Sequence, residues 1–287
     1  MKIALHDSDN TGFPNLALMK LSKFHKNEGD HVEWFNSFFT YDTIYSSKVF
    51  TYTPQNPYIP HGALKGGTGY KNNITLDSVD SSIEHIMPDY DLYGINYSMG
   101  FLTRGCIRKC KWCFVPEKEG KIKPHADITE FTKHKDVVLM DNNVLAHDHG
   151  IHQIEKIIKL GLRVDFNQGL DARLIDDAIA KLLSKVKWLH PVRLACDSLS
   201  MVEPVKKAVK LLRWRNVTPR TYFVYVLIDD IDDAVERLKE LKGINVDPFA
   251  QPYRDKDGNE PTQKQKDLAR WVNHKATFNS VWLEDYK

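Results

Sequence analysis

Three of the chain's four cysteines lie within eight residues, at Cys106, Cys110 and Cys113. In a chain of 287 residues with four cysteines, this spacing would arise by chance in about one of a thousand sequences, so we expect the sulfurs to act together. Three thiolates on a short loop can hold a soft metal, either zinc with a fourth protein ligand or an iron–sulfur cluster with one iron left open. A disulfide is a poor alternative because it would leave one of the three cysteines unpaired.

The residues around the sulfurs favour the iron–sulfur cluster over zinc. The fourth cysteine, Cys196, and the next histidine, His125, lie outside the loop, whereas structural zinc sites usually combine two pairs of ligands. Positive charge favours thiolate over thiol and offsets the negative charge of a cluster that carries three thiolates. Four basic residues supply that charge: Arg104, Arg108, Lys109 and Lys111.

With the aromatic Trp112 directly before Cys113, the motif resembles the signature of the radical S-adenosylmethionine (SAM) superfamily. The resemblance implies a [4Fe–4S] cluster on Cys106, Cys110 and Cys113 whose open iron chelates the amino and carboxylate groups of SAM. One electron would then cleave the sulfonium bond and release a 5′-deoxyadenosyl radical. The resemblance therefore also implies a flavodoxin or ferredoxin-like electron donor.

The same resemblance proposes SAM contacts by their position in the chain. Family members often carry Gly-Gly-Glu after the second strand for the SAM amine, and this chain has Asp141-Asn142-Asn143 there, so the role passes to Asp141 or Asn142. Trp112 is expected to pack beside the adenine. Polar residues after the next strands are expected to reach the SAM carboxylate or ribose: Gln168 and Asp197, with Arg173 and Arg193 as further candidates for the carboxylate. No catalytic residue is assigned.

From residue 97 onward, short apolar runs alternate with amphipathic helical patterns, which is typical of βα units. The runs lie at 97–103, 137–140, 163–168, 192–196, 222–228 and 245–250. They predict an α/β fold with a partial (β/α)6 barrel, the fold that the radical SAM resemblance also implies. Chemistry in such barrels lies at the carboxyl ends of the strands, where the cysteine loop, Asp141, Gln168, Asp197 and Asp229 fall. Helix capping and turn formation favour the same polar residues.

The first 90 residues predict a small Rossmann-like α/β domain before the barrel. A strand is expected at 2–6, a helix from Pro14 to Gly29, a strand at 31–35, an extended stretch at 43–53 and a closing strand at 89–93. The segment 13–21 resembles the cobalamin-binding-like domain that precedes many radical SAM domains. The cobalamin motif Asp-x-His-x-x-Gly is replaced by His6-Asp7-Ser8-Asp9, so we expect a degenerate domain without cobalamin, although cobalamin stays an alternative.

The expected domains are therefore 1–90, 91–255 for the radical SAM barrel, and a C-terminal helical extension at 256–287. The first includes a Gly-rich loop at 54–73, for which we expect a flexible connection or lid, since a phosphate cradle needs a strand before it and a helix after it. The acidic stretch 255–260 lacks the ligand spacing of a calcium loop and predicts a turn before a helix at 263–272. His147, His149 and His152 could share a metal, but helix capping is the expected role.

Composition narrows the class of protein. The net charge of +2 makes no strong case for nucleic acid, and no apolar run of membrane-spanning length occurs. Acidic residues follow the N-terminus too soon for a signal peptide, so we expect a cytoplasmic protein without a membrane partner. No cysteine follows Cys196, so an auxiliary cluster of the kind found in peptide-maturing relatives is not expected. No cysteine precedes Cys106, which argues against methylthiotransferases, whose N-terminal domain holds a second cluster.

The sequence thus predicts a radical SAM enzyme that uses a single [4Fe–4S] cluster to cleave SAM reductively and abstract hydrogen from an unidentified substrate. One alternative is a cobalamin-dependent radical SAM methyltransferase. Another is a non-catalytic zinc- or cluster-binding module that contacts nucleic acid through its Lys- and Arg-rich loops.

Overall fold

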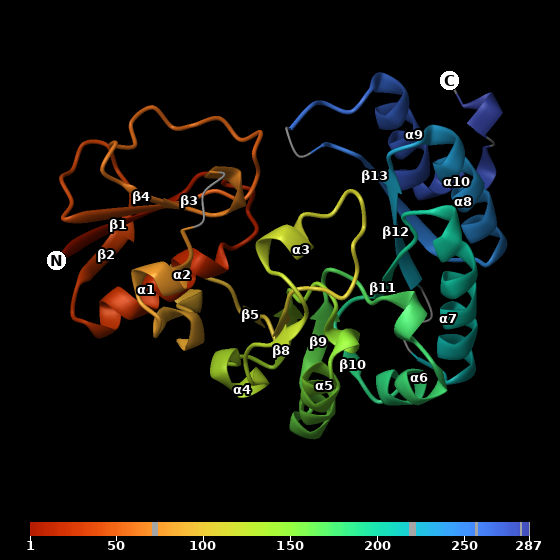
Figure 1. Ribbon diagram of the computed structural model, residues 1–287, viewed down its shortest axis with the longest axis horizontal. Helices are drawn as coiled ribbons and strands as arrows, with labels where there is room; N and C mark the ends of the chain where they lie inside the picture. Colours follow the sequence, from red (N-terminus) through yellow and green to blue (C-terminus); the bar gives the residue numbers. More distant parts are fainter. Residues whose placement is uncertain (71–73, 218–221, 256–257, 282, 287) are drawn as a thin grey trace. The chain divides into compact units, whose positions relative to one another are not determined.

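The computed structural model describes residues 1–70, 74–217, 222–255, 258–281 and 283–286 (Figure 1). The described chain divides into two compact units. Unit 1 comprises Met1–Met99 and Thr129–His134, and unit 2 comprises Gly100–Ile128 and Lys135–Lys287. The domain limits expected at residues 90 and 255 remain a prediction.

Unit 1 is built on a parallel sheet with the strand order β2-β1-β3-β4. The strands are β1 (Lys2–Asp7), β2 (His31–Trp34), β3 (Thr43–Ser47) and β4 (Leu64–Gly66). The order reverses between β1 and β3, as in doubly wound α/β folds, so the sheet is Rossmann-like as expected. Helix α1 (Leu16–Asn27) begins after its N-cap Asn15, whose side chain accepts from the backbone N of Leu18, and not at Pro14.

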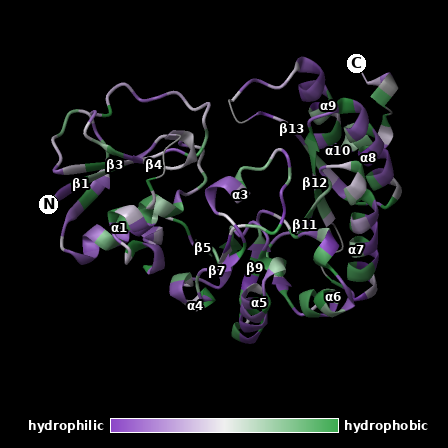
Figure 2. Cartoon of the chain, in the orientation of Figure 1, coloured by the Kyte–Doolittle hydropathy of each residue, from purple (hydrophilic) through white to green (hydrophobic). Residues whose placement is uncertain are grey.

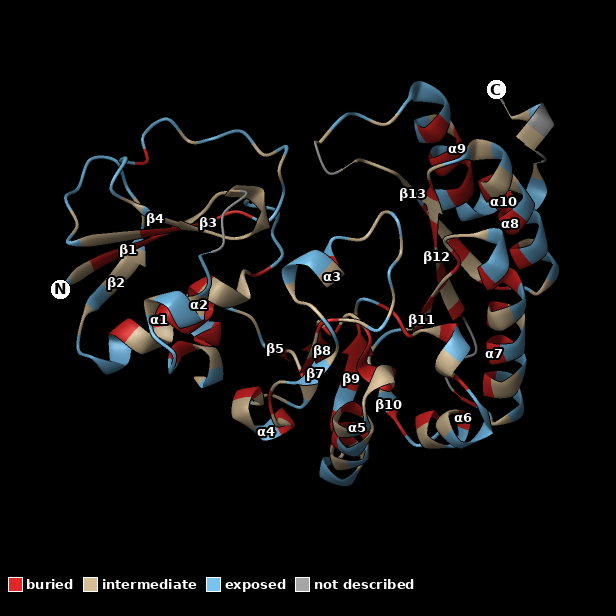
Figure 3. Ribbon diagram, viewed as in Figure 1, coloured by how far each residue is buried: buried red, intermediate tan, exposed pale blue. Residues whose placement is uncertain are grey.

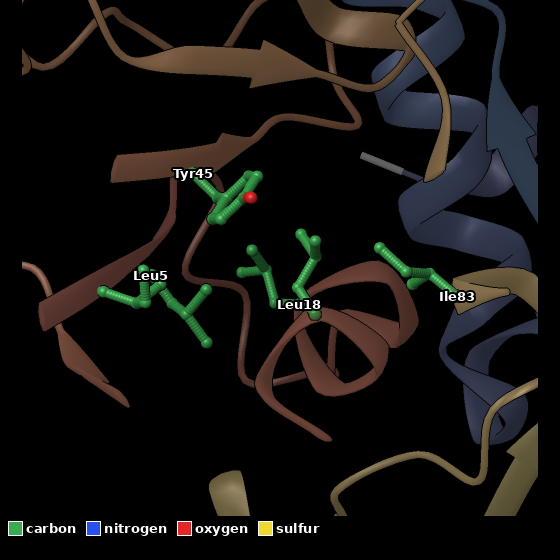
Figure 4. Packing of buried hydrophobic residues seen from close by; sticks show 6 residues of the cluster. Leu5, Leu18, Tyr45 and Ile83 are labelled. Carbon is green, nitrogen blue, oxygen red and sulfur yellow. The ribbon is translucent and has the colours of Figure 1, made fainter. Parts of the chain in front are cut away.

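The core of unit 1 lies between this sheet and α1. Leu5 and Tyr45 come from β1 and β3, Leu18 from α1, and Ile83 from a short 3-10 turn (Figure 4). Leu5, Leu18 and Ile83 are fully buried. Alternating apolar residues on the strands and the apolar stripe of the helix therefore meet in one layer, which defines the register of the strands. The short helix α2 (Leu76–Val79) lies later in the same unit.

One expectation for unit 1 is wrong. The closing strand at 89–93 is a 3-10 turn, Tyr90–Leu92, because Tyr90 turns its ring into the core and its hydroxyl bonds to the backbone of Met99. Within the Gly-rich loop, Leu64–Gly66 form the edge strand β4, which the sequence did not predict. A Cβ on Gly67 would lie 2.4 Å from the carbonyl oxygen of Lys48, so close packing demands glycine there. Residues 71–73 of the expected loop lie outside the described residues.

Unit 2 contains sheets with the orders β10-β9-β8-β5 and β11-β12-β13. The strands are β5 (Ser98–Gly100), β8 (Asp136–Leu139), β9 (Arg163–Phe166), β10 (Lys187–Trp188), β11 (Val192–Ala195), β12 (Tyr222–Ile228) and β13 (Asp247–Pro252). The boundary between the units falls within β5. The pairs β8–β9, β9–β10, β11–β12 and β12–β13 are parallel, and a parallel bridge between Leu170 and Leu194 links the two sheets. The fold is therefore α/β with parallel sheets.

Helices follow the strands of unit 2, as the alternating pattern predicted. They are α5 (Asp148–Leu160), α6 (Asp177–Leu183), α7 (Val202–Trp214), α8 (Ile231–Gly243), α9 (Gln263–Asn273) and α10 (Lys275–Ser280). The short helix α4 (Ile128–Phe131) comes before β8, and its residues from Thr129 onward belong to unit 1. Figure 3 shows α7 with a buried and an exposed side, and Val205, Val209 and Leu212 lie on the buried side. Helix α6 begins at Asp177, because the side chain of Asp176 caps it by accepting from the backbone N of Ile179.

The predicted first strand, 97–103, is interrupted. β5 ends at Gly100, and β6 (Thr103–Arg104) then pairs antiparallel with β7 (Lys123–Pro124). The cysteine loop and the short helix α3 (Val115–Lys118) lie between β6 and β7. Within the described chain, no helix has both the length and the apolar character needed to cross a membrane. Of the acidic stretch 255–260, residues 256 and 257 lie outside the described residues.

Candidate functional site

The β6–β7 hairpin holds the two ends of the cysteine loop together. Arg104 of β6 lies opposite Lys123 of β7 in the antiparallel strand register. The backbone N of Cys106 donates to the carbonyl of Gly120 at 3.3 Å. Gly105 has a φ of +81°, and a Cβ there would lie 2.4 Å from the carbonyl oxygen of Lys121. Glycine is therefore required where the chain enters the loop.

The three sulfurs lie in a half-buried, polar environment. Cys106 Sγ accepts from the backbone N of Arg108 at 3.4 Å and from Asn143 Nδ2 at 3.6 Å, contacts that stabilise a thiolate. Burial, and then the neighbouring Cys113, raise the pKa of Cys110, while Arg173 lowers it. In the part of the chain that the structure describes, no group of three or more His, Cys, Asp or Glu side chains is placed to hold a metal ion.

A cavity of about 300 Å³ lies beside the cysteine loop. Cys110 and Trp112 line it from the loop, Arg173 from the 3-10 turn after β9, and Asp197 from the end of β11. Its volume is at the lower end of the range of small-molecule pockets. Of the predicted SAM contacts, Trp112, Arg173 and Asp197 thus line one cavity together with Cys110.

Asp171 connects the segments around the cavity, and sequence reasoning did not single it out. Its side chain is 5% exposed. Its Oδ2 accepts from Arg108 Nε at 2.8 Å and from Asn143 Nδ2 at 3.2 Å, and its Oδ1 accepts from Arg173 Nε at 2.7 Å. Burial alone would raise the pKa of Asp171, but the hydrogen bonds from Arg173 and Arg108 outweigh it and hold that pKa below its usual value. The carboxylate therefore stays ionised and fixes both guanidinium groups.

Asn143 is the second residue that sequence reasoning passed over. It is 4% exposed, and its Nδ2 faces Cys106 and Asp171, as described above. Its Oδ1 is buried and accepts no hydrogen bond from any residue that the structure describes. Because an unsatisfied buried acceptor costs about 1–3 kcal/mol, this oxygen is a place where a bound donor would be stabilised.

Asp141 and Asn142, the residues predicted for the SAM amine, contact the backbone and side chains of the hairpin and its loop. The Asp141 carboxylate accepts from the backbone N of Thr103 at 2.6 Å and from its Oγ1 at 2.7 Å. Burial raises the pKa of Asp141 to about 6. Asn142 Nδ2 donates to Glu119 Oε2 at 3.0 Å, and the same oxygen accepts from the backbone N of Gly105 at 2.8 Å. Both side chains therefore stabilise the segment that leads into the cysteine loop.

The remaining predicted residues separate into distinct environments. Gln168 is exposed in the turn after β9 and is not among the residues that line the cavity in the described structure. Arg193 pairs with the buried Asp165, which leaves it tied to the sheet. Asp229 pairs with Lys111 Nζ at 2.6 Å and so anchors the cysteine loop to the end of β12. Burial raises the pKa of Asp197, whose Oδ1 accepts from the backbone N of Leu227 at 3.0 Å.

Arg237 of α8, which is 1% exposed, stabilises the backbone next to Asp197. Its guanidinium donates to the carbonyl of Cys196 at 2.5 Å and to that of Leu227 at 2.9 Å, and so joins the carboxyl ends of β11 and β12. Cys196 is fully buried, and burial raises its pKa to about 12. Cys196 therefore packs as a small apolar residue.

The histidine cluster caps a helix, as expected. His147 is the N-cap of α5, and its Nδ1 accepts from the backbone N of His149 at 3.0 Å. The His149 ring bonds through Nε2 to the carbonyl of Ala126 at 3.0 Å. These contacts give both rings a structural role.

Comparison with known proteins supports the fold of the chain, but it assigns no role to any residue. No family model matches the sequence, and no curated protein matches it. The structure of the cobalamin-dependent S-adenosylmethionine radical enzyme OxsB with aqua-cobalamin bound is similar, with a TM-score of 0.53 and 12% sequence identity. The similarity covers 97% of this chain and 56% of that one, so the chain spans little more than half of its length. The two chains therefore share a fold, at an identity too low to carry residue roles across.

Proposed function

We propose that the chain is a radical SAM enzyme that uses a single [4Fe–4S] cluster to cleave SAM reductively and to abstract hydrogen from an unidentified substrate. The observation that carries this proposal is the cavity that joins the cysteine loop to Arg173 and Asp197, at the carboxyl side of parallel strands. The fold shared with a radical SAM enzyme supports it.

The donor set fits the cluster. Cys106, Cys110 and Cys113 supply three thiolates and leave one iron for SAM. Cys106 already accepts two hydrogen bonds of the kind that stabilise cluster sulfurs, and three cationic side chains line the cavity: Arg108, Lys109 and Arg173. Because the described sulfurs are not gathered as ligands, we propose that the loop draws them together when the cluster is inserted.

When bound, the cluster supplies one electron that breaks a sulfonium C–S bond of SAM, leaving methionine and a 5′-deoxyadenosyl radical. The chain's own residues bind and orient. Arg173 is placed to pair with the SAM carboxylate, and Trp112 to pack against the adenine. Asp197 at the cavity wall would accept from the ribose hydroxyls. The unsatisfied Oδ1 of Asn143 replaces Asp141 and Asn142 as our candidate acceptor for the SAM amine.

We further propose that strands β5, β8, β9, β11, β12 and β13 of the described chain form the partial (β/α)6 barrel expected from the sequence. The bridge between Leu170 and Leu194 supports this, since it continues the pairing from β9 to β11. Strand β10, which the sequence did not predict, pairs only with the first residues of β9, at Arg163 and Val164. It would lie as a short side branch of the barrel.

Anaerobic reconstitution with iron and sulfide, followed by reductant and SAM, tests the enzyme proposal. The wild-type protein should yield 5′-deoxyadenosine, Cys110→Ala should yield none, and Cys196→Ala, in the buried fourth cysteine, should keep the activity of the wild type. A reconstituted protein that contains iron but forms no 5′-deoxyadenosine would overturn the proposal. Near-stoichiometric zinc without iron, in protein purified without oxygen, would favour the zinc-binding alternative.

A cobalamin-dependent methyltransferase is the second candidate, favoured by the bound aqua-cobalamin of the similar structure. In this chain, however, Asp9 after β1 accepts from Thr53 Oγ1 and from the backbone N of Val49, each at 2.5 Å. The segment after β3 is thereby held to the loop after β1, at the switch point where such sheets bind cofactors. We therefore propose that unit 1 holds no cobalamin. Purification with hydroxocobalamin present should leave no cobalamin absorption, and stoichiometric absorption would contradict this.

A further inference from the structure

The cavity beside the cysteine loop is small for two ligands. Its volume of about 300 Å³ is at the lower end of the range for one small molecule, and the proposed function assigns it to SAM. The substrate therefore needs room beyond it. Ala195 of β11 lines the cavity and lies opposite Tyr225 of β12 in the parallel register, so one face of the β11-β12-β13 sheet continues from the cavity wall.

The two faces of this sheet differ in burial, because successive side chains of a strand point to opposite sides. On one side of β12, where α8 packs, Tyr222 and Val224 have none of their surface exposed. On the other side, Phe223, Tyr225 and Leu227 are partly exposed. The side that continues from the cavity is therefore an apolar surface that the described chain leaves partly open.

Three aromatic rings cover this open face. The rings of Phe223 and Phe249 are stacked, with centroids 5.3 Å apart, and the ring of Tyr225 meets that of Phe223 edge-on at 5.0 Å. Tyr225 also lies opposite Phe249 in the register of β12 and β13. Figure 2 shows β12 largely in the hydrophobic colour. Such a cluster favours a flat aromatic ring, which gains both stacked and edge-on contacts.

The open face also bends toward β9. The Tyr225 hydroxyl donates to the carbonyl of Asn167, directly after β9, at 3.3 Å, although β11 is the strand that pairs with β12. Asp165 of β9 pairs in the same way with Arg193 of β11. Side chains from β9, β11 and β12 thus meet on one curved surface, with the aromatic rings on it.

The charges on this face are already neutralised. Strands β11, β12 and β13 contain two charged residues, Arg193 and Asp247. The Arg193 side chain is 17% exposed and pairs with the buried Asp165, and Asp247 pairs with Lys275. Because each charge has its partner, the face offers no excess charge to an ionic ligand. The charge and the rings together therefore favour an uncharged ligand.

We propose that the open face of β11, β12 and β13 binds the substrate through an uncharged, planar aromatic group, with Phe223, Tyr225 and Phe249 as its contacts. This inference rests on the proposed function, since it names the substrate class of the same site. A saturated ring of similar size would bury a similar apolar area but would lose the stacked and edge-on contacts. An aromatic anion would lose its hydration without gaining a free counter-charge.

Three probes test this proposal on the reconstituted holoprotein with SAM present. Naphthylmethanol is uncharged and aromatic, naphthoate is an aromatic anion, and decahydronaphthylmethanol is the saturated analogue. In calorimetric titrations, naphthylmethanol should bind about tenfold more tightly than either of the others.

Phe249→Leu, which keeps an apolar side chain but removes the ring, should weaken naphthylmethanol binding about tenfold. Phe223→Leu carries the same expectation and serves as a second variant if Phe249→Leu does not fold. Phe39→Leu is the matched control, since Phe39 is an aromatic residue of unit 1 that is 54% exposed. The control should bind naphthylmethanol as wild type does.

The outcomes separate the two proposals. If the reconstituted wild type forms no 5′-deoxyadenosine with reductant and SAM, the proposed function fails, and the titrations still decide whether the aromatic face binds a ligand. Equal affinity for naphthylmethanol and its saturated analogue would overturn the aromatic class, and tighter binding of naphthoate would overturn the uncharged class. Unchanged affinity in both Phe249→Leu and Phe223→Leu, or a loss of affinity in Phe39→Leu, would show that the probe binds elsewhere and that the assigned face is wrong.

Discussion

At the scale of single residues, Asp171 has more influence on the site than any polar residue that the sequence singled out. Its carboxylate accepts hydrogen bonds from Arg108 of the cysteine loop, from Arg173 of the cavity wall, and from Asn143, which also donates to Cys106. Burying a carboxylate is costly unless it is paired and hydrogen-bonded, and these contacts meet both conditions. Its role is to position the side chains around the cysteine loop and the cavity.

We expect Asp171→Asn to lower the free energy of unfolding of the apoprotein by about 2 kcal/mol at neutral pH, since it leaves two partly buried guanidinium groups without their counter-charge. The pKa of Asp171 is depressed, so the stability it contributes is present above the ordinary carboxyl pKa and is lost as the pH falls through the lower, folded-state value. Denaturant unfolding across this acidic range checks the effect. The difference between wild type and variant should shrink toward low pH.

Asp177→Asn is the control for this prediction. Asp177 also pairs with an arginine, Arg215, but its side chain is 54% exposed, so water can replace the lost contact. If Asp171→Asn and Asp177→Asn had equal effects, the positioning role of Asp171 would be wrong.

At the scale of elements, the β6–β7 hairpin places the cysteine loop, and its entry depends on one glycine. We expect Gly105→Ala to destabilise the hairpin strongly and to lower iron incorporation, because its Cβ would collide with the backbone carbonyl of Lys121. Gly120→Ala is the matched control: it has a similar φ of +75°, but a Cβ there meets nothing within 4 Å. Iron content after reconstitution should rank wild type first, then Gly120→Ala, then Gly105→Ala. Equal iron content in the two variants would contradict the steric argument.

The carboxyl ends of β11 and β12 depend on a buried arginine in the same way. Arg237→Met should lower the free energy of unfolding by about 3 kcal/mol, because it leaves the carbonyls of Cys196 and Leu227 without their donors. Arg213 makes a similar pair of bonds, to the carbonyls of Ile244 and Asn245, but it is exposed. Arg213→Met should therefore cost much less in the same denaturant titration. Similar losses would mean that burial does not set the strength of these bonds.

At the scale of the whole molecule, units 1 and 2 each have their own buried core and their own internal hydrogen bonds. Leu18 lies at the centre of the unit 1 core, with none of its surface exposed. We expect Leu18→Ala to destabilise unit 1 by about 2–5 kcal/mol, the usual cost of such a core cavity. Calorimetry should show an earlier transition for unit 1, while iron incorporation into unit 2 stays that of the wild type.

Leu64→Ala serves as the control, since Leu64 is 41% exposed and its loss leaves no cavity. A loss of iron in Leu18→Ala, with unit 2 otherwise folded, would show that the cysteine loop depends on the core of unit 1.

The sequence predicted the regular elements well where periodicity was strong. Continuous apolar runs at 192–196 and 222–228 are strands β11 and β12, and the helix predicted at 263–272 is α9. The short strands β4 and β10 were not predicted, because a strand of two or three residues is too short to show an alternating apolar pattern. The strand expected at 89–93 failed because Tyr90 is buried in a turn, which its β-favouring side chain does not reveal.

By itself, the sequence determined the cysteine motif and the alternation of strands and helices, because clustered residue types and apolar periodicity are local properties. Only the tertiary structure decided which polar side chains reach the cavity. It brought Arg173 and Asp197 to the cavity wall, turned Asp141 to the backbone of Thr103, and left Gln168 in solvent. The physical reason is that a polar residue after a strand can cap, pair or face a ligand, and long-range packing selects among these.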